Sequence, residues 1–404
     1  MLRTHCPLVG HFPLSPALFV LLVVALAACN KPETPTASGY GRGDLMVKIG
    51  AAAPLTGAQA HLGKDNENGA RMAIEDANAQ GIMIAGRKVK FELLSEDDQA
   101  DPKTATIVAQ KLVDAKVSGV IGHLNSGTSI PASKIYSDNG IVQISPSATA
   151  VGYTSSGFKT TFRVMANDVQ QGKVLGNYAT QMLGAKKIAV IDDRTAYGEG
   201  LAREFIKTAQ AGGAQIVAHE YTTDRAIDFT AVLTSLKGKR PELIFFGGMD
   251  SQGVPMIKQM RALGLTAKFM MGDGGYTPKL TELAGAAAEG VYASLPGVPL
   301  DKMPGGSDFS KRYQAKFQQP IQNYAPYCYD AVNVMIAAMQ KAASTEPAKY
   351  LPELAKLTHN GITAKIEFDE KGDLKNSAIT LYQIQKGQWQ ALQTIDNDAI
   401  TSTH

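Results

Sequence analysis

From Leu45 onward the chain alternates short apolar runs with longer amphipathic stretches, and this alternation limits the folds that it can adopt. Strands rich in Val, Ile and Leu that alternate with helices are typical of a parallel sheet with helices on both faces. The pattern pauses near Thr160–Val164 and then restarts, so we expect two parallel sheets, one after the other. No residue-level repeat relates the two halves, and the expected similarity is therefore architectural.

Hydrophobic periodicity separates the helices of the first half from its strands. Ala70, Ala73, Ile74 and Ala77 share one face of a helix, because they recur with a period near 3.6. The expected elements of this half are Leu45–Ala53, a helix from about Asp65 to Gln80, Val89–Leu94, Pro102–Asp114, Gly119–Gly122, Pro131–Asn139 and Ile141–Ser145. Those of the second half are Val169–Leu183, Ile188–Ile191, Gly200–Gln210, Ile216–His219, Phe229–Leu236, Leu243–Phe246, Gln252–Leu263 and Phe269–Met271.

The last third of the chain does not contain a third full set of strands and helices. Its expected elements are a strand near Gly290–Ser294, helices at Tyr329–Ala342 and near Lys349–Leu357, and a hairpin of Ile379–Ile384 with Trp389–Leu392 joined at Lys386-Gly387. We therefore expect the tail to return and complete the earlier sheets. The predicted fold class is α/β, with two Rossmann-like lobes on parallel sheets joined by several crossing strands. A cleft between such lobes is the default ligand site, because ligands bind at the carboxyl ends of the strands.

The start of the chain predicts export. Arg3 is the only charge before Lys31, and an apolar run from Ala17 to Ala28 ends at Cys29. A charged start, a short apolar centre and small residues before the cut describe a secretory signal peptide, and the run is shorter than the roughly 20 residues that span a bilayer. An uncleaved signal anchor is the alternative. Leu26-Ala27-Ala28-Cys29 resembles a bacterial lipobox, in which the cysteine is lipidated.

The composition after Cys29 predicts a tether followed by the folded body. Asn30 to Gly43 is rich in Pro, Thr, Ser and Gly, which is typical of a flexible linker. Removal of Cys6 with the signal and lipidation of Cys29 would leave Cys328 without a partner for a disulfide, as a small core residue. We expect a signal peptide at 1–28, a linker at 29–44, a first lobe from 45–164 and 296–370, a second lobe at 165–295, strands at 371–395 that complete the second lobe or hinge, and a tail at 396–404.

Charge and motifs argue against several classes of function. With 40 Lys+Arg against 37 Asp+Glu, the net charge of +3 implies no nucleic-acid partner. No phosphate-binding loop or nucleophile elbow occurs, and Gly39-Tyr40-Gly41 precedes the first strand, the wrong place for dinucleotide binding. Asp97, Asp98 and Asp101 could hold a cation, but acidic residues at a strand end and a helix start more often serve as helix caps. We therefore expect no catalysis, no cofactor and no metal.

Small polar residues follow several of the predicted strands. Asn125 and Ser126 come after Gly119–Gly122, and Ser147, Ala148 and Thr149 come after Ile141–Ser145. Hydroxyls and backbone N–H groups at helix N-termini suit a carboxylate, although for each segment taken alone capping by Ser and Thr is the better explanation. In the second half Asp273 stands among glycines that allow close approach of a ligand, and a simple Asp turn is its alternative interpretation.

The chain resembles the substrate-binding proteins of branched-chain amino acid (leucine/isoleucine/valine) ABC transporters, which have the type I periplasmic-binding fold. The likeness runs along nearly all of Leu45–Leu392. The matching segments are Ile49–Gly57, Ala73–Gly81, Asp101-Pro102-Lys103, Val120–Ser126, Ile144–Ala150, Tyr197–Ala202 and Phe368–Leu374.

The resemblance implies a role for each matching site residue. Ser126 and Thr149 would bind the ligand's α-carboxylate, and the Ser147 carbonyl with the Asp273 side chain would hold the α-ammonium. Tyr197 would close over the ligand from the second lobe. Ala148 belongs to the same binding segment as Ser147 and Thr149.

Several positions depart from the leucine-binding pattern. Asp273 replaces a Glu, and Ser147 replaces an Ala. Leu62 and Met249 stand where that pattern has Tyr, and Ala100 and Asn125 replace its Cys pair. These changes keep the backbone clamp and reshape the pocket for the ligand's side chain, which Leu62, Asn125 and Met249 are expected to line.

The expected protein is an extracytoplasmic solute-binding protein without enzymatic activity. It would capture a branched-chain or other aliphatic amino acid by lobe closure and deliver it to the membrane permease subunits of an ABC importer. We expect a monomer in the periplasm, attached to the membrane only through a lipid on Cys29, or on the cell surface of a Gram-positive host. The alternatives are a sensor domain of the same fold for amides, urea or another small molecule, and an extracellular α/β enzyme.

Overall fold

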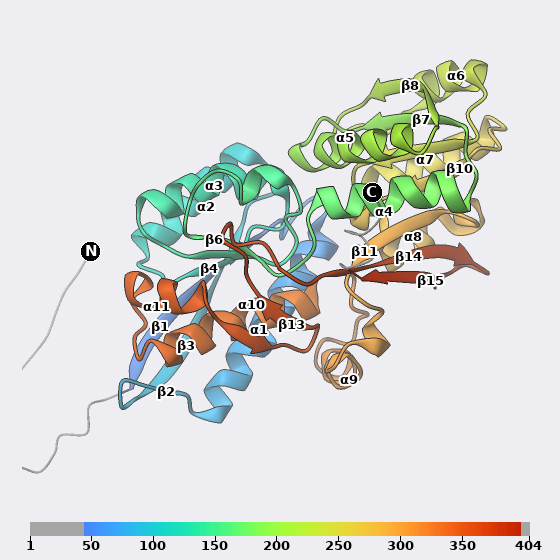
Figure 1. Ribbon diagram of the computed structural model, residues 1–404. Coiled ribbons are helices and arrows are strands. Elements are labelled where there is room, and N and C mark those ends of the chain that lie inside the picture. The colour runs from blue at the N-terminus through green and yellow to red at the C-terminus, as the bar shows by residue number, and fades with distance from the viewer. Residues whose placement is uncertain (1–43, 397–404) are drawn as a thin grey trace, which may run out of the picture. The chain divides into compact units, whose positions relative to one another are not determined.

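The computed structural model describes residues 44–396 of the 404-residue chain. The expected signal peptide, Cys29, the linker up to residue 43 and the tail from residue 397 lie outside the described residues. Within 44–396, helices surround a six-stranded sheet, which we call the core of the first lobe, and a seven-stranded sheet, the core of the second lobe (Figure 1). No helix in this range is both long enough and apolar enough to cross a membrane.

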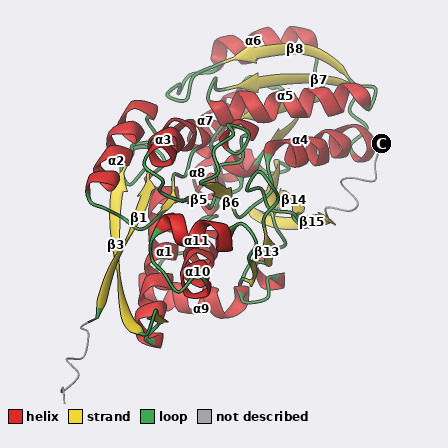
Figure 2. Cartoon of the chain, turned by 60° about the vertical axis from the view of Figure 1, so that its left-hand side comes forward, coloured by secondary structure: helices red, strands yellow, loops and turns green. Residues whose placement is uncertain are grey.

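The first lobe is built on a sheet of order β2-β3-β1-β4-β5-β6, parallel except for β2 at its edge. Its strands are β1 (Leu45–Ala53), β2 (Met83–Ile84), β3 (Arg87–Asp97), β4 (Val120–Gly122), β5 (Gln143–Ser145) and β6 (Thr161–Arg163). Helices α2 (Pro102–Asp114) and α3 (Ser126–Asp138) pack together on one face. On the other face α1 (Ala60–Gln80) packs on α10 (Ala325–Lys341), with α11 (Pro347–Leu354) beside it (Figure 2).

The second lobe is built on a sheet of order β15-β14-β11-β10-β9-β7-β8, in which only β14 and β15 run antiparallel to their neighbours. Its strands are β7 (Lys187–Asp192), β8 (Gln215–Tyr221), β9 (Leu243–Gly247), β10 (Lys268–Met271), β11 (Tyr292–Pro296), β14 (Ala378–Gln385) and β15 (Gln388–Asp396). Its helices are α4 (Asp168–Asn177), extended by a π turn at Tyr178–Met182, α5 (Ala196–Ala211), α6 (Thr230–Lys239), α7 (Asp250–Ala262) and α8 (Pro278–Ala284).

The remaining elements lie in the last third of the chain, except for one short turn after β5. They are α9 (Gly306–Phe317), the hairpin of β12 (Thr358–Asn360) with β13 (Lys365–Glu367), and short 3₁₀ turns at Val151–Tyr153, Asp273–Gly275, Gly285–Ala288 and Leu300–Lys302. The chain passes from the six-stranded to the seven-stranded sheet after β6, leaves the seven-stranded sheet after β11 for helices that pack on the first lobe, and returns to it with β14. The ends of the strands therefore lie next to the connections on which the two lobes would pivot.

The contact between α1 and α10 depends on one glycine. A β-carbon built on Gly69 would lie 2.2 Å from the Ala325 carbonyl oxygen. Because backbone lies so close to backbone at this point, the two helices can approach only where one of them has no side chain. The approach places the start of α10 beside the middle of α1.

The expected fold class is confirmed, and so is the β14–β15 hairpin with Lys386 and Gly387 as its two-residue turn. Both turn residues have positive φ, +53° and +75°, as tight hairpin turns of the right twist require. The pause near Thr160–Val164 was misinterpreted, because β6 forms there and completes the first sheet.

Several expected boundaries were wrong. Helix α3 begins at Ser126 rather than at Pro131, so the proline lies inside the helix at the loss of one backbone hydrogen bond. Helix α1 begins at Ala60 rather than near Asp65. Helix α10 begins at Ala325 rather than at Tyr329, because Asp65 accepts hydrogen bonds from the backbone N–H groups of residues 322–325. In addition, β2, α8, α9, β12 and β13 were not expected.

Candidate functional site

The loops after β4 and β5 meet at the carboxyl edge of the first sheet. Ser126 is the first residue of α3 and is buried, and its Oγ accepts a hydrogen bond of 3.1 Å from the Ala150 N–H. The Ser147 hydroxyl donates to the Leu124 carbonyl at 2.9 Å. These bonds join the two loops into one polar surface at the N-terminus of α3, where hydroxyl and N–H groups favour a negatively charged ligand group.

Hydrogen bonds among buried side chains beneath this polar surface fix its position. Nδ1 of His123 lies 2.7 Å from Asp98 Oδ2, and Nε2 lies 3.1 Å from the Tyr136 hydroxyl. The hydroxyls of Ser129 and Ser145 both donate to the His123 carbonyl. A histidine fixed at both ring nitrogens therefore sets the position of the loop that leads to Ser126.

Arg163 holds the second loop in a similar way. It is fully buried in β6 and donates to the Ala148 carbonyl at 2.6 Å and to the Ala150 carbonyl at 3.0 Å. Its charge is balanced by Asp373 at 2.6 Å. Sequence reasoning missed Arg163, although Asp373 lies in one of the segments that carried the family resemblance.

Asp273 follows β10 in the second lobe and is 1 % exposed. Its Oδ1 accepts from Gln171 Nε2 at 2.9 Å and from the Tyr197 hydroxyl at 3.0 Å, and its Oδ2 accepts from the Tyr324 hydroxyl at 2.7 Å. Burial raises the pKa of the Asp273 carboxyl, and these three hydrogen bonds act against the rise. Tyr324 is the N-cap residue of α10 in the first lobe, and the side-chain amide of the neighbouring Asn323 donates to the Asp273 carbonyl at 3.0 Å.

A second buried carboxyl, which sequence reasoning missed, lies close to Asp273. Asp168 begins α4 and is fully buried, and within the described residues neither of its carboxylate oxygens has a hydrogen-bond partner. Burial, and to a smaller extent the charge of Asp273, raise the pKa of Asp168 to about 8. The Thr149 hydroxyl and the Arg163 guanidinium act in the opposite direction and lower this pKa. The Asp168 N–H donates to the Thr149 carbonyl at 2.9 Å. Asp168 thus lies against the loop that carries Thr149, within reach of the charge of Asp273.

One small cavity of about 10 Å³ collects most of the expected site residues, and at that volume it has room for about one water molecule. Its lining is Leu124, Asn125, Ser126, Ser147, Tyr197, Met249, Asp273 and Tyr324. Leu62, Ala148 and Thr149 do not line it, but all three are buried. Leu62 belongs to the same apolar cluster as Tyr197, Met249 and Tyr324. A cavity of 10 Å³ means that the loops must part to admit a ligand of amino-acid size.

The lobes also touch outside this cavity. His61 of α1 contacts Asp250 of α7 at 2.7 Å, and Arg225 of the second lobe lies 3.8 Å from Asp101, the N-cap of α2. Together with the Tyr324–Asp273 contact, these pairs describe a closed arrangement. Closure of two lobes over a ligand is a hinge transition.

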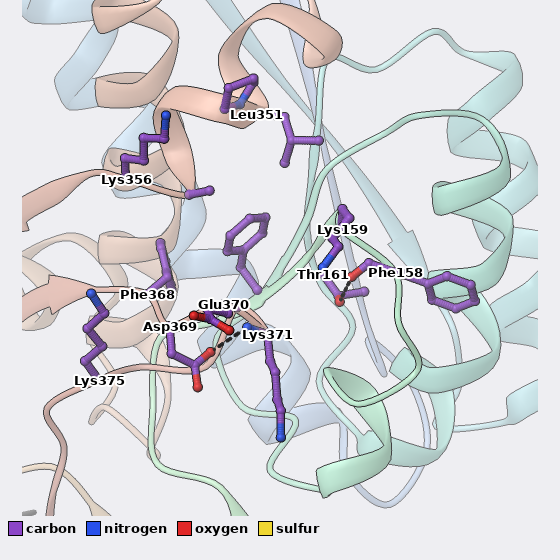
Figure 3. Close-up of a pocket in the computed structure, with 14 residues that line it drawn as sticks. Phe158, Lys159, Thr161, Leu351, Lys356, Phe368, Asp369, Glu370, Lys371 and Lys375 are labelled. Atoms are coloured by element: carbon purple, nitrogen blue, oxygen red, sulfur yellow. Dashed lines mark hydrogen bonds between the residues drawn. The ribbon is translucent and has the colours of Figure 1, made fainter.

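A larger groove of about 650 Å³ lies elsewhere in the first lobe, next to the start of β6. Figure 3 shows side chains from the loop before β6, from α11 and from the turn at 369–375 around it. Four lysines, Lys159, Lys356, Lys371 and Lys375, share its rim with Asp369 and Glu370. None of the expected site residues lines it. Across residues 44–396 no cluster of His, Cys, Asp or Glu could hold a metal ion.

Two lobes that bring polar loops from the ends of their strands together over one buried cleft define a solute-binding protein. The chain belongs to the periplasmic binding protein family, whose model matches residues 46–388. The expected family resemblance is thereby confirmed.

The similarity of the chain to individual proteins agrees with its membership of this family. A leucine-, isoleucine-, valine-, threonine- and alanine-binding protein of Pseudomonas aeruginosa is 36% identical over 349 residues, which cover 86% of this chain and 92% of the relative. A leucine-binding protein of Thermotoga maritima has a TM-score of 0.81 at 27% identity, covering 87% of this chain and 99% of that one. A branched-chain amino acid binding protein of Streptococcus pneumoniae in complex with isoleucine has a TM-score of 0.79 at 26% identity, covering 87% and 99%.

Proposed function

We propose that this protein captures an α-amino acid by lobe closure and delivers it to an ABC importer. The observation that carries the proposal is the polarity of the cleft: a helix N-terminus with hydroxyls lies at one end, and the buried Asp273 carboxyl lies at the other. Such a cleft is complementary to a zwitterion, whose carboxylate and ammonium need opposite partners. The relatives described as leucine- and isoleucine-binding proteins support the same ligand class.

Each head group of the ligand is assigned to named atoms. The hydroxyls and N–H groups of Ser126 and Thr149 bind the α-carboxylate. The Ser147 carbonyl and the Asp273 carboxylate bind the α-ammonium. Charge-assisted hydrogen bonds of this kind contribute roughly 1.5–3 kcal/mol each.

The side chain of the ligand packs against apolar groups beside the head-group site. Leu62 and Met249 lie in the same buried cluster as Tyr197 and Tyr324. This surface suits an aliphatic side chain, because its burial contributes about 25 cal/mol per Å². A branched-chain or other aliphatic amino acid is therefore the ligand that we propose.

The same proposal covers the protein's partners and place in the cell. The closed body is presented to the membrane permease subunits of the importer, outside the cytoplasm. A signal peptide directs export, and a lipid on Cys29 is the only attachment to the membrane. The body works as a monomer in the periplasm, or on the cell surface in a Gram-positive host.

A thermal-shift screen of the purified protein against the standard amino acids, short amides and urea tests the proposal. A ligand at 100 times its Kd adds about 2.7 kcal/mol of stability, which raises Tm by several degrees. We expect the rise with Leu, Ile, Val or Ala. No shift with any amino acid would refute amino-acid capture, and a shift confined to amides or urea would support a sensor of the same fold.

A further inference from the structure

A second cavity, of about 390 Å³, opens directly beside the amino-acid site. It shares Asn125, Tyr197 and Met249 with the small cavity described above, and both lobes contribute to its wall. A ligand whose head group is held at Ser126 and Asp273 would therefore have room for a longer side chain in this direction.

The wall of this second cavity contains a buried acceptor without a partner. Asp193 is 2 % exposed and lines the cavity. Its Oδ1 accepts from the Thr195 N–H at 2.9 Å and from the Thr195 hydroxyl at 2.6 Å, whereas its Oδ2 has no hydrogen-bond partner in the described residues. Buried carboxylate oxygens normally accept a hydrogen bond, so a hydrogen-bond donor from a ligand is expected at this oxygen.

The other charges of the cavity wall leave it negative. The half-buried Asp224 lines it as well, and the charges of Asp224 and Asp192, after burial, raise the pKa of Asp193 to about 6. Arg194 also lines the cavity, but its guanidinium stacks over the Tyr221 ring at 3.4 Å from the centroid. Asp193 therefore remains mostly ionised at neutral pH, and no cation from residues 44–396 pairs with its free oxygen.

We propose that this cavity receives the far end of a longer side chain, and that besides aliphatic amino acids the protein binds amino acids whose side chains end in an ammonium or guanidinium group. The cation would pair with Asp193 and lie near Asp224. The inference rests on the proposed function, because only a head group fixed at Ser126 and Asp273 directs a side chain into this cavity.

Pairs of ligands that differ only in the terminal cation give the test. Isothermal titration of the purified full chain compares L-lysine with L-norleucine and L-arginine with L-citrulline, with L-leucine as the reference. We expect lysine to bind at least about tenfold more tightly than norleucine, and arginine more tightly than citrulline, a difference of about 1.4 kcal/mol or more. Norleucine binding at least as tightly as lysine would overturn the inference while leaving amino-acid capture intact. Failure of every amino acid to bind would refute the proposed function itself.

Variants identify the carboxylate that is responsible. Asp193→Asn keeps an oxygen for the Thr195 donors and should reduce the lysine-to-norleucine preference at least about tenfold without changing norleucine affinity. Asp224→Asn, at a half-buried position, should reduce the same preference by a smaller factor and serves if Asp193→Asn does not fold. Asp228→Asn, an exposed aspartate beyond the cavity, is the matched control and should leave the preference unchanged. An unchanged preference in both cavity variants would contradict the assignment.

Discussion

Nε2 of His61 lies 2.7 Å from Oδ2 of Asp250, and this contact joins the first lobe to the second. His61 is in the first turn of α1, and Asp250 begins α7 and is 2 % exposed. The same carboxylate oxygen accepts from the Thr277 hydroxyl at 2.7 Å. Since the two partners sit on different lobes, separation of the lobes breaks the contact, and the pair stabilises the closed form specifically.

Replacement of His61 by Ala should therefore weaken ligand binding without unfolding either lobe. A hydrogen bond to a buried carboxylate contributes about 1.5–3 kcal/mol, so we expect leucine affinity to fall about 10- to 150-fold. Isothermal titration measures the affinity, and small-angle scattering with saturating ligand measures closure. His219→Ala is the matched control, because His219 contacts Asp192 at the same 2.7 Å within one lobe. Equal affinity losses in the two variants would contradict a role in closure.

Asp273→Ala should weaken amino-acid binding by more than about 1.5 kcal/mol, since it removes a buried carboxylate facing the ligand's ammonium. The change also leaves the Gln171, Tyr197 and Tyr324 donors without their acceptor. Isothermal titration with leucine gives the affinity, and circular dichroism checks that the variant is folded. Asp138→Ala, on the exposed end of α3, should bind as the parent protein does. Unchanged affinity of folded Asp273→Ala would remove Asp273 from the site.

The part of the site that sequence predicted lies at the ends of parallel strands. Ser126, Ser147 and Asp273 follow β4, β5 and β10, and all three line one cavity. Topology explains this success, because the carboxyl ends of parallel strands meet at one edge of each sheet. Their roles toward a ligand remain predictions until the binding experiments are done.

The site residues that the sequence did not predict lie in segments whose local pattern gives no indication of ligand binding. Asp168 is an acidic residue in the first turn of a helix, which by itself indicates only a favourable dipole interaction. Gln171 and Arg163 gain their roles from burial between segments far apart in the chain. Tyr324 was missed because the pattern placed the start of its helix at Tyr329.

The unexpected elements have a similar explanation. Helix α9 carries several charged residues and buries only Gly306, Phe309 and Tyr313, so its apolar face is too narrow for periodicity to detect. Strands β2, β12 and β13 are two or three residues long and depend on their pairing partners rather than on their own composition.

Asp168 predicts a specific dependence of stability on pH in the absence of ligand. Its ordinary pKa of 3.8 applies in the unfolded chain, and the folded value is about 8. Below the first value the carboxyl is protonated in both states. Between the two values folding takes up a proton, so the free energy of unfolding falls as pH rises, and above the second value the loss is complete. Asp168→Asn removes this dependence.

Urea unfolding of the parent protein and of Asp168→Asn near pH 5, 7 and 9 measures the effect. We expect the stability advantage of the variant to grow with pH to roughly 3–5 kcal/mol and then to level off. Asp138→Asn, an exposed carboxyl, should show no such trend. A constant difference between Asp168→Asn and the parent protein would mean that Asp168 is ionised throughout.

Cys29→Ser should release the protein from the membrane. A lipid anchor holds by burying acyl chains, at about 0.8 kcal/mol per CH₂, and serine cannot carry it. Fractionation of cells that produce the full chain, followed by detection in membrane and soluble fractions, measures the release. Persistence of Cys29→Ser in the membrane fraction would favour an uncleaved signal anchor.

Gly69→Ala should destabilise the protein and disturb the site through α10. The new methyl group would lie 2.2 Å from the Ala325 carbonyl oxygen, which is backbone and can yield only if α1 and α10 move apart. Ala325 and Tyr324 also donate their N–H groups to Asp65 of α1, at 2.9 and 2.8 Å, so the movement would weaken the anchor of the Tyr324 hydroxyl on Asp273. We expect the free energy of unfolding, measured with urea, to fall by about 1–3 kcal/mol.

Gly238→Ala in α6 is the control, because nothing lies within 4 Å of the new methyl group. Its free energy of unfolding should be unchanged or rise by about 0.5–1 kcal/mol from helix propensity. A Gly69→Ala variant as stable as Gly238→Ala would show that the two helices do not need this close approach.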